Sequence, residues 1–406
     1  MLEKKARVLV LCSLIALSAG CKVSAEDIDY WKGTVKGPGK ITAVMLADKY
    51  PMELRTQAAL ALVQMNRTDR DGIADLQQAL ARLDDTTRAQ VVAGLVPGLE
   101  KQMNEADPKL ENGAPSPGQI RAKDAAFVLI PYASPEIKAQ LTQQVVGWYA
   151  QDFNGRSLSG NFSAEQVVRA LGSPAAKVLV VGLKAQLPQQ ALVKMAQLIG
   201  QVADPATKKE AGERLVAIEQ EMESAEFLGW ITKTIEDQQK GNKIDPAKLK
   251  KAAEMNRDNF INDGAIAAMK WLADEPPVKK RLLALASTPN KADPETRRVR
   301  ALAALEGKVD RGDLQQVLAL ALDNNNPKTV RDYAFDRVGD IKSPEALPSL
   351  WPLVSGAEDP KLRWRAGEMV LAIGGSGIVD EFFSRLPGGG EYPPRSWRAT
   401  LPAWVR

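Results

Sequence analysis

A turn built around a proline recurs at a fixed interval in the last third of the chain. The prolines are Pro294, Pro327 and Pro360, each 33 residues after the one before it. The seventh residue after each proline is small: Ala301, Ala334 and Gly367. The eleventh residue is apolar: Leu305, Val338 and Leu371. A fixed period of this length predicts an array of repeats, in which each unit buries its apolar face against its neighbours.

The residues around each proline are those that begin an α-helix. Asp or Asn precedes the proline and can cap the helix, and a proline in the first turn removes no hydrogen bond. Another kind of helix start shares a Ser-Pro-Glu pattern: Ser134-Pro135-Glu136 and Ser343-Pro344-Glu345. Since the small residues let a neighbouring helix approach closely, we expect helix contacts at these positions: Ala301, Ala334, Ala366 and Gly367.

The same spacing of a proline, a small residue and an apolar residue also fits earlier parts of the chain. It begins again at Pro51 and at Pro205, and the segment from Asp75 to Leu80 is echoed by the segment from Asp313 to Leu318. Only 5% of the residues are aromatic, and Ala and Leu dominate the apolar ones, which favours helices over strands. The repeat array is predicted to cover residues 42–386, with a drifting period between about 100 and 290.

Two segments carry a family resemblance. The segments Pro51–Met65 and Pro360–Gly375 resemble HEAT repeats, and they are closest to the bacterial subclass related to bilin-lyase repeats. This resemblance implies an all-α fold, an α-solenoid of antiparallel helix pairs. An array of about 345 residues would hold about nine pairs of ~33–47 residues each. Armadillo and tetratricopeptide repeats are the competing assignments, and the aromatic pattern of the second is missing.

The first twenty residues have the order of a secretory signal. Lys4, Lys5 and Arg7 precede a ten-residue apolar stretch, Val8–Leu17, which is too short to span a bilayer. Small residues and Cys21 follow, an order that resembles the lipobox of bacterial lipoproteins, although Ser18 stands where the family usually has Leu. The resemblance implies that residues 1–20 are removed and that Cys21 is acylated with fatty acids such as palmitate. The alternative is an ordinary secretory signal cleaved near Ala19.

Acylation would place the chain in the bacterial cell envelope. Cys12 lies in the apolar stretch, so Cys21 would be the one mature cysteine, with no internal disulfide. Lys22 stands where retention in the inner membrane usually requires Asp, so the family analogy favours the outer membrane, facing the periplasm or the surface. The segment 21–41, with its Gly33–Gly39 stretch, is predicted to be a flexible tether, and residues 387–406 a tail rich in Pro, Gly and Trp.

The chain contains no histidine, which narrows the function classes. A His-dependent catalytic triad, a His-ligated metal site and the commonest general base are impossible without it. No other acid–base constellation is visible, so we expect no enzyme activity, no metal and no cofactor. The net charge is +4 without a long basic run, which argues against nucleic acid as a partner.

The recurring arginines Arg55, Arg297 and Arg363 have two interpretations. They either form a polar ladder with the capping aspartates of neighbouring repeats, which we favour, or a basic strip for an acidic partner. With a lipid anchor and a repeat array, the sequence predicts a lipid-anchored scaffold or adaptor that binds a protein partner. The alternatives are a lyase-like HEAT-repeat enzyme and a module that binds a cell-wall or surface polymer.

Overall fold

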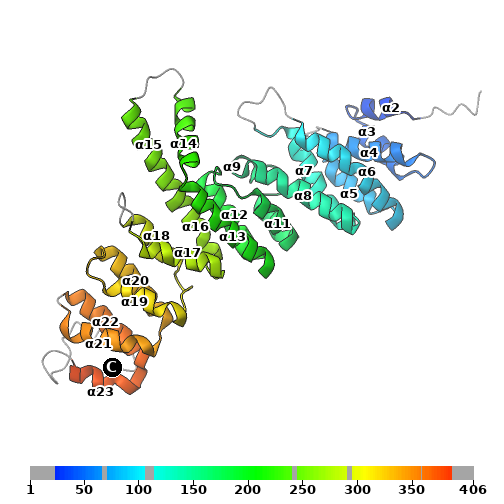
Figure 1. Cartoon of the computed structure of the whole chain (residues 1–406). Helices are drawn as coiled ribbons and strands as arrows, with labels where there is room; N and C mark the ends of the chain where they lie inside the picture. The colour runs from blue at the N-terminus through cyan, green and yellow to red at the C-terminus, as the bar shows by residue number, and fades with distance from the viewer. Residues whose placement is uncertain are drawn as a thin grey trace, which may run out of the picture. The chain divides into compact units, whose positions relative to one another are not determined.

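A computed structural model describes residues 23–65, 71–105, 114–239, 245–289, 295–357 and 359–385 (Figure 1). Every element in these ranges is a helix. Consecutive helices pack as antiparallel pairs that stack on the next pair. Figure 1 shows this for α19 (Leu314–Leu322) with α20 (Lys328–Ile341) and for α21 (Leu347–Gly356) with α22 (Pro360–Gly374). The predicted all-α fold, a HEAT-like α-solenoid, is therefore confirmed. The chain divides into two compact units, residues 1–182 and 183–406.

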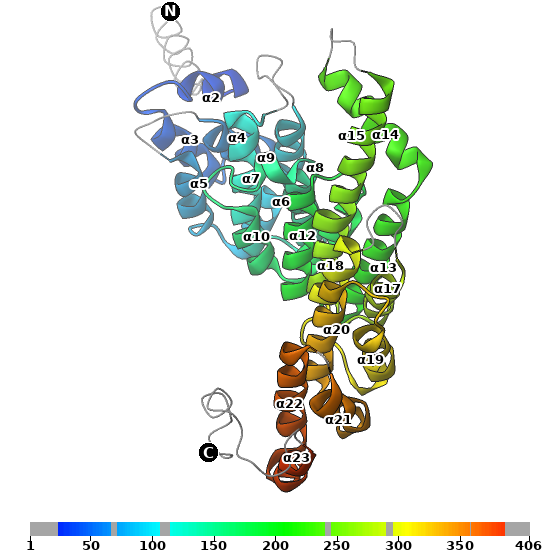
Figure 2. The same cartoon turned by 90° about the vertical axis from the view of Figure 1, so that its left-hand side faces the viewer.

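Unit 1 is built on long helices that lie side by side, α4, α6, α7 and α8 (Figure 2). Their inner faces carry fully buried apolar side chains such as Leu62, Leu95 and Val145. The elements of unit 1 are α2 (Ala25–Trp31), α3 (Gly37–Leu46), α4 (Met52–Gln64), α5 (Gly72–Leu80), α6 (Asp85–Asn104), α7 (Pro117–Leu129), the short η2 (Ile130–Tyr132), α8 (Pro135–Gln151), α9 (Phe153–Arg156), α10 (Ala164–Leu171) and α11 (Ser173–Gly182).

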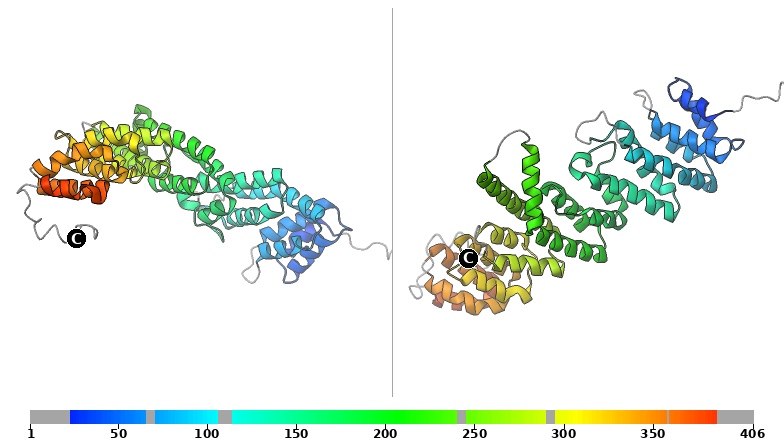
Figure 3. Two further views of the ribbon diagram at one scale, coloured as in Figure 1. Left: turned by 90° about the horizontal axis from the view of Figure 1, so that it is seen from below. Right: turned by 45° about the horizontal axis from the view of Figure 1, so that its top comes forward.

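Unit 2 contains the regular repeats, and its α18, α20 and α22 stack one beside the next (Figure 2). Its elements are α12 (Gln189–Val202), α13 (Pro205–Met222), α14 (Ala225–Gln238), α15 (Pro246–Asn259), the π-helix η3 (Phe260–Ile266), α16 (Ala267–Met269), η4 (Lys270–Leu272), α17 (Pro276–Ser287), α18 (Thr296–Ala304), η5 (Arg311–Asp313), α19 (Leu314–Leu322), α20 (Lys328–Ile341), η6 (Pro344–Ala346), α21 (Leu347–Gly356), α22 (Pro360–Gly374), η7 (Gly375–Ile378) and α23 (Val379–Arg385). The views in Figure 3 separate the yellow pair α19/α20 from the orange pair α21/α22.

The small residues of the repeat frame lie where the sequence predicted helix contacts. Ala301, Ala334 and Ala366 are fully buried, and Gly367 is buried beside them. The apolar residues Leu305, Val338 and Leu371 are also buried. The echoed segments likewise bury equivalent leucines, Leu76 in α5 and Leu314 in α19. The repeat period therefore identified the packed faces correctly.

The predicted caps of α13 and α22 are confirmed, and the predicted cap of α20 is wrong. Asp293, the predicted cap of the Pro294 repeat, lies outside the described residues, and Glu295 at the N-cap of α18 makes no side-chain hydrogen bond there. Asp204 and Asp359 accept backbone hydrogen bonds from Thr207 and Lys361, each over 2.8 Å. Asn326 does not cap α20, because its amide donates to the carbonyl of Leu320 and accepts from the Arg298 guanidinium. Pro327 occupies the N-cap of α20 and offers no side-chain hydrogen bond.

The predicted flexible tether over residues 21–41 needs correction, since α2 (Ala25–Trp31) and the start of α3 (Gly37–Leu46) lie within it. Ser24 begins α2 with a capping box closed by Asp27, and Ile28 and Ile41 are fully buried. Pro38 stands in the first turn of α3, where it costs no hydrogen bond. Gly37 is required because a Cβ there would lie 1.7 Å from the Trp31 carbonyl oxygen. Gly37 and Pro38 thus serve a tight helix start rather than flexibility.

Candidate functional site

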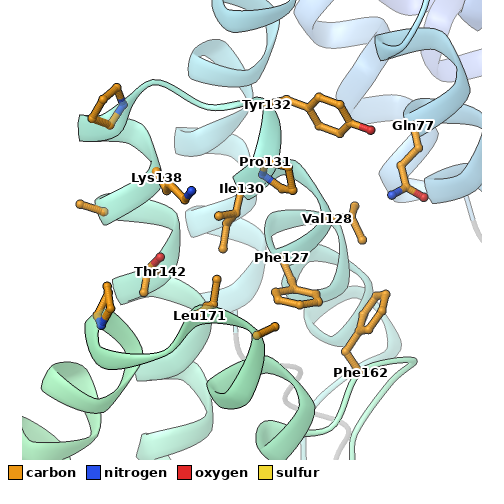
Figure 4. Close-up of a pocket in the computed structure, with 14 residues that line it drawn as sticks. Gln77, Phe127, Val128, Ile130, Pro131, Tyr132, Lys138, Thr142, Phe162 and Leu171 are labelled. Carbon is orange, nitrogen blue, oxygen red and sulfur yellow. The ribbon is translucent and has the colours of Figure 1, made fainter. Parts of the chain in front are cut away.

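A pocket of about 660 Å³ opens on the surface of unit 1 (Figure 4). Its walls come from α5, α7, η2, α8, α10, α11 and the segment between α9 and α10. Fourteen residues line it: Gln77, Phe127, Val128, Ile130, Pro131, Tyr132, Pro135, Lys138, Ala139, Thr142, Phe162, Ala170, Leu171 and Pro174. Among these lining residues Lys138 alone carries a charge. The pocket therefore presents an apolar floor with very few polar groups.

The helix starts around the pocket follow from the local sequence. α7 begins with a capping box formed by Ser116 and Gln119. α8 begins as predicted, with Ser134 as its cap and Pro135 in the first turn. Pro131 lies in η2, between the end of α7 and the start of α8. The turn between these helices thus places two prolines in the pocket wall.

Two phenylalanines form one wall of the pocket. Figure 4 shows the side chains of Phe127 and Phe162 near each other. Their rings meet edge to face, and the ring centroids are 4.9 Å apart. Phe127 lies on α7, whereas Phe162 lies in the segment between α9 and α10, which has no helical hydrogen bonds of its own. The position of Phe162 is held by contacts from neighbouring helices, in addition to the backbone hydrogen bond from Ala164 to the Ser157 carbonyl (2.8 Å).

Those contacts come from a buried charged pair on α7. The Lys123 ammonium, which is fully buried, donates to the carbonyl oxygens of Ser159 (2.9 Å) and Phe162 (3.0 Å) and to the Asp124 carboxylate. Its three donors are thereby all used. Asp124 in turn accepts a 2.9 Å hydrogen bond from the backbone of Asn161. This Lys123–Asp124 pair holds the backbone of residues 159–162 in one place.

The segment is also constrained by a tyrosine and a glycine. The Tyr149 hydroxyl donates to the Phe162 carbonyl, and its ring lies 5.0 Å from the Lys123 ammonium. Gly160 has φ +85°, and a Cβ there would lie 2.6 Å from Asp124 Oδ2. No other residue type fits this position without strain, so the turn is matched to the pair beneath it.

Burial changes the acid–base properties of this cluster. Desolvation lowers the pKa of the Lys123 ammonium, and the hydrogen bond and charge of Asp124 oppose that change. Desolvation also raises the pKa of the Tyr149 hydroxyl, and the negative charge of Asp124 adds to the effect. The tyrosine therefore stays protonated at neutral pH and keeps its donor role.

Tyr132, at the other end of the pocket, is held by an arginine. The guanidinium of Arg88 lies 5.7 Å from the centre of the Tyr132 ring, a cation–π contact. That guanidinium is itself fixed by the carbonyl oxygens of Leu80 (2.8 Å) and Leu83 (2.6 Å) and by Asp85 (2.9 Å). The backbone of Phe162 and the ring of Tyr132 thus each have a partner within unit 1 that does not depend on a ligand.

Arg55 and Arg297 have structural roles, as the ladder interpretation predicts. Arg55 is buried and donates to the Met45 carbonyl (2.8 Å) and to Asp48 (3.0 Å). Arg297 is also buried and pairs with Glu223 and Asp258. One detail was wrong, because none of these acidic partners is the N-cap residue of a helix. Arg363 is half-buried.

Ion pairs connect successive repeats of unit 2. Arg365 pairs with Asp332 over 3.0 Å and with Asp336, and Lys308 pairs with Asp274 over 2.6 Å. A bidentate pair joins Arg281 of α17 to the fully buried Glu219 of α13 through two hydrogen bonds of 2.7 and 3.0 Å. These contacts tie neighbouring helices together, and they occupy much of the positive charge along the repeats.

Cys21, the predicted lipidation site, lies outside the described residues, as do the predicted signal segment and the tail 387–406. Within the described ranges, no group of His, Cys, Asp and Glu side chains could hold a metal ion. No helix in the part of the chain that the structure describes is long and apolar enough to cross a membrane.

Sequence reasoning did not find the pocket. Its lining residues extend from Gln77 to Pro174, and Phe162 belongs to a segment with no periodic pattern. One signal was available. Lys123-Asp124 interrupts the apolar run of α7, and adjacent charges in a buried helix face indicate a specific polar contact.

Comparison with known proteins gives only distant structural likenesses. The sequence matches no protein family and no curated protein. Among solved structures, the chain is similar to the crystal structure of Kap121p, with 12% identity and a TM-score of 0.37 over 89% of this chain. It is also similar to the crystal structure of Uso1-2, with 14% identity and a TM-score of 0.31 over 89% of this chain. The chain spans 38% of the first protein and 64% of the second.

Proposed function

We propose that the chain is a lipid-anchored adaptor of the bacterial cell envelope, which binds a protein partner in the apolar pocket of unit 1. Acylation at Cys21 would supply the anchor, and the membrane would be the outer one. The observation that carries the binding role is the fixed aromatic lining of the pocket, held by Lys123 beneath Phe162 and by Arg88 beside Tyr132. Preorganised aromatic side chains gain affinity because little conformational entropy is lost on binding.

The chemistry of the pocket favours a protein over a surface polymer. A carbohydrate needs many hydrogen-bonding groups, because its buried hydroxyls must be paired. This pocket offers few polar side chains, chiefly Gln77, Tyr132, Lys138 and Thr142. A lyase would need acid–base groups in the pocket, and the lining residues offer only Lys138 and Tyr132 for this role. No observation favours a lyase activity.

The proposed lipid anchor is tested by replacing Cys21, whose thiol would receive the lipid. Cys21→Ala should prevent acylation, because the thiol that receives the lipid is gone. We expect the variant either to stay unprocessed or to move to the soluble fraction, as measured by fractionation and by mass spectrometry of the N-terminal peptide. Mature Cys21→Ala protein that stays in the membrane fraction would contradict the proposed anchor.

Binding in the pocket is tested by a substitution that places a long, charged side chain at the pocket opening. Ala139 is exposed on α8 and lines the pocket, so Ala139→Arg can project a long cation across the opening without disturbing the core. We expect a partner that co-purifies with the wild-type protein from solubilised envelope to be lost, with at least tenfold lower recovery.

The matched control is Gln140→Arg, which adds the same charge to the next residue of α8. Gln140 is exposed and does not line the pocket. The control should recover the partner as the wild type does. Equal recovery with both variants would place the binding surface elsewhere, and equal loss would point to a general charge effect.

A further inference from the structure

We infer that the partner presents a segment with an aliphatic or aromatic anchor residue and an acidic residue beside it. This inference rests on the proposed function, and it adds the chemistry of the bound segment. The anchor side chain would fill the apolar floor between Phe127, Phe162 and Leu171. The acidic group would meet Lys138 at the edge.

The opening of the pocket favours a protein segment over a small molecule. Several lining residues are exposed at its mouth: Pro131, Ala139, Ala170 and Pro174. Small-molecule sites bury most of the ligand surface, whereas a site open on one side leaves much of such a ligand in water. A protein segment seals the mouth with its own flanking residues, as the energetically neutral rim does around an interface anchor.

The positive charge of Lys138 indicates that the partner's residue next to its anchor side chain is acidic. Lys138 is exposed on α8, and its ammonium makes no ion pair with any of the described residues. Four acidic side chains lie on the helices that form the pocket, and each has its own contacts. Glu165 pairs with Arg169 over 3.0 Å, and Asp124 is buried beneath the floor. Glu136 forms hydrogen bonds at the start of α8 with Ser134 and its own backbone, and Asp75 on α5 also has a partner. A carboxylate from a partner would therefore be the first to neutralise this positive charge. A basic residue at the same point would be repelled.

The test is a selection from random peptides displayed on phage against the purified full chain, repeated with Lys138→Glu. The wild type should enrich peptides that have an apolar residue with Asp or Glu close to it. The Lys138→Glu variant should enrich peptides with Lys or Arg there instead, and it should bind the acidic peptides about tenfold more weakly. Lys101→Glu reverses an exposed charge on α6 outside the pocket, and it should select as the wild type does.

The outcomes separate this inference from the proposed function. Peptides that are lost with Ala139→Arg but show no charge preference would overturn the acidic segment and leave the pocket as the binding site. Recovery of no peptide that depends on the pocket would contradict both. A fluorescent fatty acid serves as the competing probe. If it bound one to one and Ala139→Arg abolished this binding, the occupant would be a lipid and not a peptide.

Discussion

Lys123→Met should lower the free energy of unfolding by about 3–5 kcal/mol, the largest effect that we expect from a single substitution in unit 1. The variant keeps the volume of the side chain but leaves the Asp124 carboxylate buried without its cation. It also leaves the carbonyl oxygens of Ser159 and Phe162 without the donor that holds them. A buried charge without a partner cannot recover its lost hydration, which is the source of the cost.

Urea denaturation at neutral pH, followed by circular dichroism, measures this effect. Lys101→Met is the matched control, because it removes an exposed lysine and should change stability by less than about 0.5 kcal/mol. Lys123→Met combined with Asp124→Leu should recover part of the loss, since the orphaned charge is then gone. If Lys123→Met cost less than about 1 kcal/mol, the pair would not anchor the segment that carries Phe162.

Ala334→Trp should destabilise unit 2 by about 3 kcal/mol or more. Ala334 is fully buried on α20, which packs against α18 and α19, so an indole has no space without moving a helix. Tyr333→Trp is the matched control, since Tyr333 is the preceding residue on the same helix and is 39% exposed. The control should stay within about 0.5 kcal/mol of the wild type in the same denaturation experiment. Equal stability of the two variants would show that the small residue is not required.

The sequence was sufficient for the features that depend on local chemistry and on the repeat period. Ser134 and Asp359 cap helices because their side-chain oxygens accept the first free backbone hydrogen bonds. The period placed Ala301 and Ala334 in buried contacts, since a residue at the same position of each repeat meets the same environment. A helix cap depends only on residues next to it in the sequence. The repeat period can be identified because the same pattern occurs in several repeats.

Where a residue's role depends on a contact outside its own helix, the sequence was insufficient. Asn326 was expected to cap α20, but Arg298 and the Leu320 carbonyl hold its amide. Gly37 and Pro38 resemble a linker in sequence, and only the approach of the Trp31 carbonyl shows that they begin a helix. The pocket itself requires Phe162 to lie beside Phe127, and this depends on hydrogen bonds to a lysine 39 residues earlier in the chain.

The central claim is that a protein partner binds in the pocket of unit 1. Photo-crosslinking from within the pocket tests it most directly. Benzoylphenylalanine is placed at Ala170, an exposed lining residue, or at Gln140, an exposed residue of α8 that does not line the pocket. We expect irradiation of cells to give a discrete crosslinked protein from position 170 only, and Ala139→Arg should abolish that crosslink. The claim would be contradicted if position 170 gave no crosslink, or if both positions captured the same protein equally.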